Sequence, residues 1–513
     1  MNLRMIIAGV LTGTCFTAPT LAQTSVSADS LRPPRAFDPG PRPIGNQSIA
    51  PQGAIPLPQG ILDTIQPKDA AGNGAGRQLP QLTSDQTTFW FASLAVFGQV
   101  ATVDGAVDPA TNNPTLRGLG PGFNGESCVS CHAFPAIGGS SPPSNPQVKS
   151  AAAKGAQNTV PSFITVNGPV REARFVRATG DGLPAGAVRP LFSVQGRSDA
   201  LGCVLPQTDF ATQLQRRNVV FRIPTPTFGV GYIENTSDDT LRNSFQATES
   251  QRAHLGIGGH FNTSGNDQTI ARFGWKAQNK SLLLFSGEAA NVEMGMTNEL
   301  FPNERLAGTG CNGNPLPEDT SNIVSPPTPL PPLPGDVSAV ISSDVVNFGV
   351  FARLNAAPSQ CAFDSGVDSS GAAVCTPFAN SPHAASIASG QARFKSVGCT
   401  LCHTDTLTTE PSSFASLNKA TYHPYSDFAV HAMGQSLADG VTQGAAAGDE
   451  YRTAPLWGLG QRIFFLHDGR TSDLLEAIAA HQGSDSEANG VIRNFNSLTD
   501  AQKQDVLNFL RSL

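Results

Sequence analysis

The stretch Cys399-Thr-Leu-Cys402-His403 decides how this chain is organised, and the same pattern occurs earlier as Cys128-Val-Ser-Cys131-His132. In Cys-x-x-Cys-His the two thiols are spaced to add across the two vinyl groups of one porphyrin, and the next histidine reaches the iron as its proximal ligand. The alternatives are a zinc knuckle, which needs further ligands at short spacing, and a redox Cys-x-x-Cys, which does not require the histidine. The two motifs therefore predict two covalently attached haem c groups. Their attachment residues are Cys128, Cys131, His132, Cys399, Cys402 and His403.

The start of the chain has the pattern of a signal peptide over residues 1–22. A charged start at Arg4 is followed by the apolar run Met5–Leu11 and a small-residue region that ends at Ala22. This run is too short to cross a bilayer and no later segment is long and uncharged enough, so we expect no membrane span. Covalent haem attachment belongs to oxidising compartments. We therefore expect a periplasmic or secreted protein.

Charge and composition exclude one class of partner. The net charge is −7, and removal of Arg4 with the signal peptide, which contains no acid, makes it −8. Charged residues are only 14% of the chain and form no basic patch, so nucleic acid is not an expected partner. The 51 Gly and 40 Pro residues predict long irregular connections rather than regular sheets.

Four cysteines remain after the signal peptide and the two haem motifs are set aside. Cys361 with Cys375 is the favoured disulfide because it closes a short loop, and Cys203 with Cys311 then follows by elimination. The alternative is four free buried thiols.

The remaining pattern predicts a mainly α protein with two cytochrome c-like haem lobes, long irregular loops and little β-structure. Residues 23–80 form a Pro/Gly-rich arm, 82–357 an N-terminal haem domain with a large insertion, and 381–513 a C-terminal cytochrome c domain. Hydrophobic spacing predicts helices within both haem domains, and Pro-rich residues 315–334 predict a stiff surface connection. The expected helices are 83–100, 281–296, 336–355, 384–396 and a last one from Ser497, with one short strand at 218–223.

Eight phrases of the sequence, in this order, resemble the di-haem oxidoreductase family, which belongs to the wider dihaem cytochrome c peroxidase superfamily. They are GFNGESCVSCH, RIPTPTFGVGYIE, RFGWKAQ, GMTNELFP, GCTLCHT, HAMGQSLADG, YRTAPLWGLG and FLHDGR. The resemblance covers about residues 82 to 513, and dihaem rubber oxygenases are similar at a greater distance. The resemblance implies the scaffold and the cofactors, but it does not identify a substrate.

The resemblance implies a sixth ligand for the second haem at His481, about a turn and a half into a helix after the His-Asp-Gly phrase. Met433 and an open position are the alternatives. Two histidine ligands lack the thioether that raises the potential, so a low potential is expected. His467 is expected to be structural.

Other polar residues near the second motif are compatible with more than one role. Arg452 and Arg470 are candidate partners of the haem propionates, since a buried carboxylate needs a cation, although surface salt bridges are equally compatible. His423 and His431 are left unassigned.

The first haem has no local candidate for a sixth ligand. After His132 the next histidine is His254, and no methionine occurs before Met294. An open iron can bind peroxide or dioxygen, so we expect this haem to be the reaction centre.

Peroxide cleavage also needs a group that moves a proton. The candidates are Glu234, His260, Glu288 and Glu293, each with a structural role as the alternative. Trp275, with Phe273, is a candidate electron relay or a plain core residue.

The expected function is that of an oxidoreductase. The second haem would accept electrons from a soluble electron-donor protein and pass them to the first, which would reduce peroxide. The alternatives are a non-catalytic electron carrier and a dioxygen-using oxygenase. A calcium ion between the lobes is left open.

Overall fold

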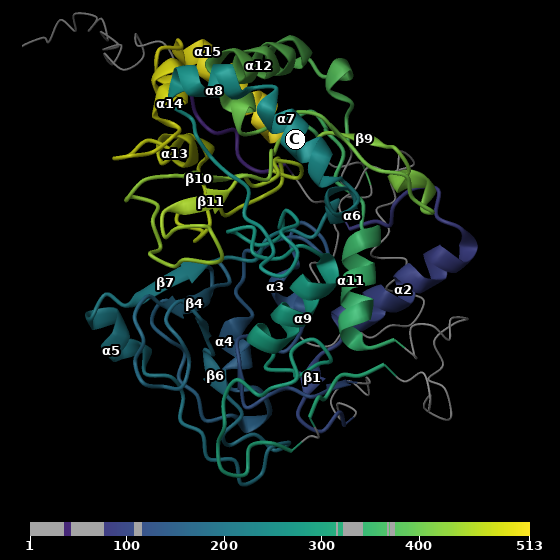
Figure 1. The fold of residues 1–513 in the computed structure, drawn as a ribbon, viewed down its shortest axis with the longest axis vertical. Coiled ribbons are helices and arrows are strands. Elements are labelled where there is room, and N and C mark those ends of the chain that lie inside the picture. The colour runs from purple at the N-terminus through teal and green to yellow at the C-terminus, as the bar shows by residue number, and fades with distance from the viewer. Residues whose placement is uncertain are drawn as a thin grey trace, which may run out of the picture. The chain divides into compact units, whose positions relative to one another are not determined.

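The structure is a computed structural model that describes residues 35–42, 76–106, 115–313, 316–321, 342–366, 369 and 375–513. The described residues from Ala36 onward belong to one compact unit (Figure 1). The expected signal peptide, most of the 23–80 arm and most of the Pro-rich connection lie outside the described residues. The domain boundaries 82–357 and 381–513 stay predictions.

The described part of the chain contains many helices and several very small sheets, as the sequence predicted for a mainly α protein. The helices are α2 Ser84–Gly98, α3 Cys128–Cys131, α4 Gln147–Ser150, α5 Phe210–Gln215, α6 Val230–Glu234, α7 Asp238–Gln246, α8 Glu249–Leu255, α9 Leu282–Glu293, α11 Asp344–Leu354, α12 Ala384–Val397, α13 Leu474–Ala479, α14 Asn489–Asn496 and α15 Asp500–Ser512. The strands are β1 Ala101–Thr102, β2 Leu116–Arg117, β3 Gly122–Phe123, β4 Glu172–Phe175, β5 Val188–Arg189, β6 Phe192–Ser193, β7 Val219–Arg222, β8 Leu407–Thr408, β9 Thr421–Tyr422, β10 Val430–Ala432 and β11 Glu450–Arg452. No described helix is both long enough and apolar enough to cross a membrane.

Helices α2, α9 and α11 lie together beside the first motif (Figure 1). Thr83 caps α2, the helix expected at 83–100, through a capping box with Gln86. The rings of Phe97 on α2 and Phe351 on α11 have centroids 4.4 Å apart, inside a large apolar core. This core fixes the helix that precedes the first cysteine pair.

Helices α12 and α15 cross closely beside the second motif. At Gly390 on α12, a Cβ atom would lie 1.9 Å from the carbonyl oxygen of Asp505 on α15, so only glycine permits this approach. Phe394 and Phe509 pack across the same interface with ring centroids 5.5 Å apart. The two helices are those that the sequence predicted at 384–396 and from Ser497 onward.

Most expected elements are confirmed. Ser281 caps α9, and the expected strand at 218–223 is β7, which pairs antiparallel with β4. The helix expected at 336–355 is α11, which begins at Asp344 with Ser343 as its cap, and residues 336–341 of that prediction lie outside the described residues. A serine side chain that accepts the Val346 N–H stabilises this start.

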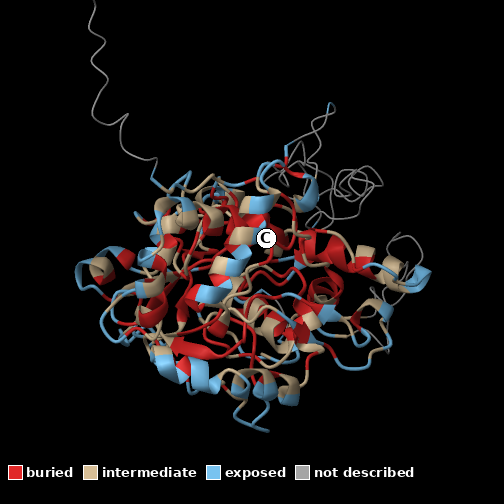
Figure 2. Ribbon diagram, turned by 90° about the horizontal axis from the view of Figure 1, so that it is seen from above, coloured by how far each residue is buried: buried red, intermediate tan, exposed pale blue. Residues whose placement is uncertain are grey.

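Both expected disulfides are present. Cys203 is bonded to Cys311, and Cys361 is bonded to Cys375. The alternative of four free thiols at these positions is therefore wrong, and the free thiols of the described chain are those of the two motifs. Figure 2 shows that buried residues run through the interior of the fold.

The short segment at residues 35–42 packs against the C-terminal helices. The carboxylate of Asp38 accepts two hydrogen bonds from Arg511 on α15, at 2.7 and 2.6 Å, and one from the N–H of Leu474 at the start of α13. Both side chains of this ion pair are almost fully buried. Burial alone would raise the pKa of Asp38, but the hydrogen bonds and charge of Arg511 outweigh it and lower that pKa.

Asp38→Asn is expected to destabilise the protein by about 3 kcal/mol, because it leaves the buried guanidinium of Arg511 without its counterion. Since the folded-state pKa of Asp38 is lowered, its contribution is present above the ordinary pKa of aspartate and is lost as the pH falls below it. Denaturant unfolding at pH 7 and pH 3 measures both effects. Equal stability of the two proteins at pH 7 would contradict the assignment.

Candidate haem sites

Each Cys-x-x-Cys-His motif lines its own large cavity. The first cavity, of about 1190 Å³ including its open part, contains Cys128, Cys131 and His132. The second, of about 1340 Å³, contains the equivalent residues of the 399–403 motif. A smaller space of about 620 Å³ lies between them and shares Trp275 with both.

A single helical turn brings the thiols and the histidine of each motif together. The N–H of His132 donates to the carbonyl of Cys128 at 3.0 Å, and that of His403 donates to the carbonyl of Cys399 at 2.9 Å. Ser127 caps the first turn, and the second follows α12 directly. Burial raises the pKa of the Cys131 and Cys399 thiols to about 12.

Both motif histidines have the ring orientation of a metal ligand. Nδ1 of His132 lies 3.0 Å from the carbonyl oxygen of Gly139, and Nδ1 of His403 lies 2.8 Å from that of Tyr425. An Nδ1–H that donates to a carbonyl leaves Nε2 free with its lone pair. Burial lowers the pKa of both imidazoles to about 4, so both are neutral, as coordination requires.

The second cavity contains a third imidazole held in the same way. His481 lines it, and its Nδ1 lies 2.8 Å from the carbonyl oxygen of Ala477. Burial lowers its pKa as well. His481 lies two residues beyond the end of α13 rather than within that helix as expected. Met433 also lines this cavity, so it stays the alternative ligand.

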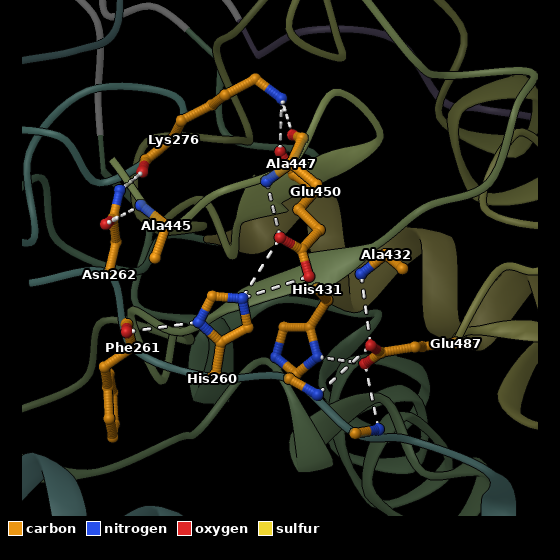
Figure 3. Close-up of polar contacts among 12 residues, drawn as sticks. His260, Phe261, Asn262, Lys276, His431, Ala432, Ala445, Ala447, Glu450 and Glu487 are labelled. Carbon is orange, nitrogen blue, oxygen red and sulfur yellow. Dashed lines mark hydrogen bonds and ion pairs between the residues drawn. The ribbon is translucent and has the colours of Figure 1, made fainter. Parts of the chain in front are cut away.

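The other histidines of this lobe are engaged elsewhere. His431 lines the second cavity, but its two nitrogens lie 2.8 Å from Glu487 and 3.1 Å from Asp427, so neither is free for iron (Figure 3). His423 lies at the surface beside Asp405. His467 is buried against Tyr451, with ring centroids 4.3 Å apart, which fits its expected structural role.

The structure separates the four proton-transfer candidates into two groups. Glu288, within α9, and Glu293, the last residue of α9, line the first cavity. Glu234 does not line it: its carboxylate accepts from the N–H of Leu282 and pairs with Arg353. His260 also lies elsewhere, half-exposed, with Nε2 3.2 Å from both oxygens of Glu450 (Figure 3).

A second carboxyl group meets Glu293 in the first cavity. Glu172 on β4 lines the same cavity, and the carboxyl groups of Glu172 and Glu293 are hydrogen bonded to each other. Asn124 donates to Glu293 at 2.9 Å, and Arg174 donates to Glu172 at 2.6 Å.

The two carboxyl groups have opposite pKa shifts. Burial and the nearby charge of Glu172 raise the pKa of Glu293 to about 8. Burial would raise the pKa of Glu172, but Arg174 and Arg222 outweigh it and lower that pKa. The pair therefore holds one proton at neutral pH, on Glu293.

Trp275 lies between the cavities, which is the position that an electron relay requires. It lines both cavities and the space between them, and its Nε1–H donates to the carbonyl of Ile223 at 2.8 Å. Its ring meets His467 edge to face, with centroids 6.4 Å apart. Phe273 lines only the intermediate space.

Residues 170–513 match the family model described as "Di-haem oxidoreductase, putative peroxidase". The chain belongs to this family. No curated protein matches the chain. The matched part contains the second motif, His481, Glu172, Glu293 and Trp275, whereas the first Cys-x-x-Cys-His precedes it. Haem is therefore a family property, whereas its attachment in the first cavity stays a prediction from the chain's own motif.

The charged side chains that line the second cavity of this di-haem oxidoreductase also suit haem. Arg452 and Arg462 line it, and neither forms an ion pair with a carboxylate among the described residues. Arg452 is buried and Arg462 is partly buried. Burial lowers the pKa of both to about 10, so both stay charged. Two guanidinium groups without carboxylate counterions at the wall of the cavity suit the two propionates of a haem. Arg470 instead pairs with Asp468 at the surface.

Arg462→Met is expected to destabilise the haem-loaded protein by about 2 kcal/mol, the contribution of a hydrogen bond to a charged group. Arg470→Met is the matched control, because its exposed ion pair contributes at most about 1 kcal/mol. Denaturant unfolding followed by haem absorbance measures both. Equal losses in the two variants would remove Arg462 from the propionate site.

Sequence reasoning missed three residues of the sites: Glu172, Arg174 and Arg462. Glu172 and Arg174 are two residues apart on β4, and both reach the first cavity. In the sequence these two charged residues alternate with the apolar Ala173, which is buried in the structure. Such alternation predicts any half-buried strand, so it does not identify a functional site. Arg462 lies just after the YRTAPLWGLG phrase, and this position is the only feature of the sequence that associates Arg462 with the haem site.

Proposed function

We propose that this di-haem oxidoreductase is an exported c-type cytochrome that reduces peroxide in its first cavity with electrons received at its second. One observation carries the proposal: the first cavity contains a motif histidine and a protonated carboxyl pair but no second histidine, whereas the second contains two histidines with Nε2 free. Covalently attached haem would supply the iron that binds peroxide and the centre that accepts electrons.

The residues of the first cavity supply the proton chemistry. Reduction of one peroxide to two waters takes two electrons and two protons, so a group that holds a proton inside the cavity is needed. Glu293 holds that proton, and Asn124 orients its carboxyl group. Glu172, kept ionised by Arg174, accepts the hydrogen bond from Glu293 and so directs the shared proton.

The residues between the cavities supply the electron path. Trp275 is in van der Waals reach of both cavities, and its backbone carbonyl accepts the N–H of Arg452, a residue of the second cavity. Electrons would enter from a soluble donor protein at the second cavity and pass Trp275 to the first. The two disulfides and the signal-peptide pattern support a periplasmic or secreted location.

A plain electron carrier is the second candidate, because Met294 is buried and lines the first cavity. A thioether ligand from Met294 would close the first iron and leave both haems six-coordinate.

Optical and EPR spectra of the ferric protein, followed by peroxide addition, test the two candidates. The peroxidase predicts one high-spin haem, oxidation of a reduced donor by peroxide, and no change of the high-spin signal in Met294→Leu. The electron carrier predicts two low-spin haems indifferent to peroxide, with a high-spin signal that first arises in Met294→Leu.

A further inference from the structure

A buried group of three charged side chains lies between the two cavities, and of the three only Arg222, which lowers the pKa of Glu172, has entered the chemistry described above. Asp439 accepts two hydrogen bonds from Arg222, at 2.9 and 2.6 Å, and its other oxygen lies 3.3 Å from Nζ of Lys276. All three side chains are at most 3% exposed. The group has two cations and one carboxylate, so it carries an excess positive charge inside the protein.

Each end of this charged group reaches a different cavity. Arg222, the last residue of β7, lines the first cavity. Nζ of Lys276 lies 4.3 Å from the ring centre of Tyr451, and Tyr451 lines the second cavity. Lys276 also follows Trp275, which lines both. The excess charge therefore lies within the wall that the two cavities share.

The position of Lys276 is fixed by its neighbours. Nζ donates to the carbonyl oxygens of Ala447 and Glu450, at 2.6 and 2.8 Å (Figure 3). The carboxylate of Glu450 is directed away, to His260. With three acceptors and no exposed surface, the ammonium group is held inside the protein, where solvent screens its charge weakly.

We propose that Lys276, through Asp439 and Arg222, makes the two haem sites a single redox unit whose two reduction potentials are set by one shared charge. The inference rests on haem in both cavities, and it adds to the proposed function a reason why the two sites respond together. A fixed positive charge in a low-dielectric wall favours the reduced state of any centre beside it. Lys276 acts through the field at the haems, so it is a positioning residue rather than a catalytic one.

The proton of Lys276 gives the proposal a second consequence. Burial and the charge of Arg222 lower its pKa to about 8, against the opposing charge of Asp439. The other titratable groups that face it are Asp449 and Tyr451, and burial raises the pKa of that phenol. Loss of the proton removes one positive charge, so both potentials are expected to fall as the pH rises through about 8.

The test is potentiometric titration of the haem-loaded protein at pH 7 and across pH 7 to 10, with the two haems distinguished by their spectra. Lys276→Met should lower both potentials at pH 7, and Lys276→Arg should restore both, because arginine keeps its charge. Lys276→Arg should also abolish the fall of the second potential near pH 8, whereas at the first haem the ionisation of Glu293, whose pKa is about 8, leaves part of the fall. Lys280→Met is the matched control, since Lys280 lies four residues along and pairs with Asp267 outside both cavities.

The proposal is overturned if Lys276→Met shifts the potential of one haem only or of neither, if Lys276→Arg behaves like Lys276→Met, or if Lys280→Met shifts both as far. The pH titration of the unmodified protein needs no variant to fold, and pH-independent potentials there would also overturn it. None of these measurements uses peroxide. A protein with linked potentials that ignores peroxide would refute the proposed function and leave this inference standing.

Discussion

Glu293→Gln is expected to lower the rate of peroxide reduction by about two to four orders of magnitude, the usual contribution of a positioned acid–base group. The amide keeps the shape of the side chain and the contact with Asn124, but it has no proton to give to a leaving oxygen. Stopped-flow mixing of the reduced protein with peroxide measures the step directly. Haem content and the spectra of both haems should stay unchanged.

The pH dependence of the same step follows from the pKa of Glu293. Because burial and the charge of Glu172 raise that pKa to about 8, the protonated form is present below pH 8 and is lost above it. The rate should therefore fall above about pH 8 in the unmodified protein, whereas Glu293→Gln should be slow at every pH.

Glu234→Gln is the matched control for Glu293→Gln. Glu234 was a sequence-based candidate of the same type, yet its carboxylate is used by Leu282 and Arg353 outside the first cavity. It should retain nearly full activity. A full rate in Glu293→Gln, or equal losses in the two variants, would exclude Glu293 as the proton donor.

His481→Ala is expected to have the largest spectroscopic effect. The second haem should stay attached through its two thioethers and His403, but it should lose its sixth ligand and change from low to high spin. About half of the total haem absorbance should be affected, since the first site has no described contact with His481. Electron transfer from the donor should slow, because a site that gains or loses a ligand must reorganise.

Met433→Leu is the control for His481→Ala, because Met433 lines the same cavity. An unchanged spectrum in His481→Ala together with a high-spin haem in Met433→Leu would move the ligand to Met433. The hydrogen bond that fixes Nδ1 of His481 favours His481 as the ligand, and therefore a high-spin second haem in His481→Ala.

The sequence was most informative where chemistry depends on residues close together in the chain. The two Cys-x-x-Cys-His motifs, the cap of α2 at Thr83 and the Cys361–Cys375 disulfide are all set by local spacing. The motif thiols line two large cavities, as the haem interpretation requires.

The sequence was least informative where segments far apart in the chain meet. Glu293 lies beside Glu172, 121 residues earlier, only because α9 and β4 enclose one cavity (293 − 172 = 121). His260 and Glu234 occur in equally promising phrases, but the fold directs them to Glu450 and Arg353. A pattern of residue types contains no information about which of several acids a long-range packing arrangement will turn toward a cavity.

The same limit applies to Asp439. Its phrase, HAMGQSLADG, contributed to the family resemblance, but only the fold shows that the carboxylate lies between Arg222 and Lys276. A buried charged group between two redox sites has to be found in the structure, since its members come from three segments.

Mass spectrometry of the exported protein and of its peptides tests the central assignment, two haems on one chain, most directly. We expect an intact mass raised by two haem groups, with one on the peptide that contains Cys128 and Cys131 and one on the peptide that contains Cys399 and Cys402. A mass with fewer than two haems, or free thiols on either peptide, would contradict the assignment.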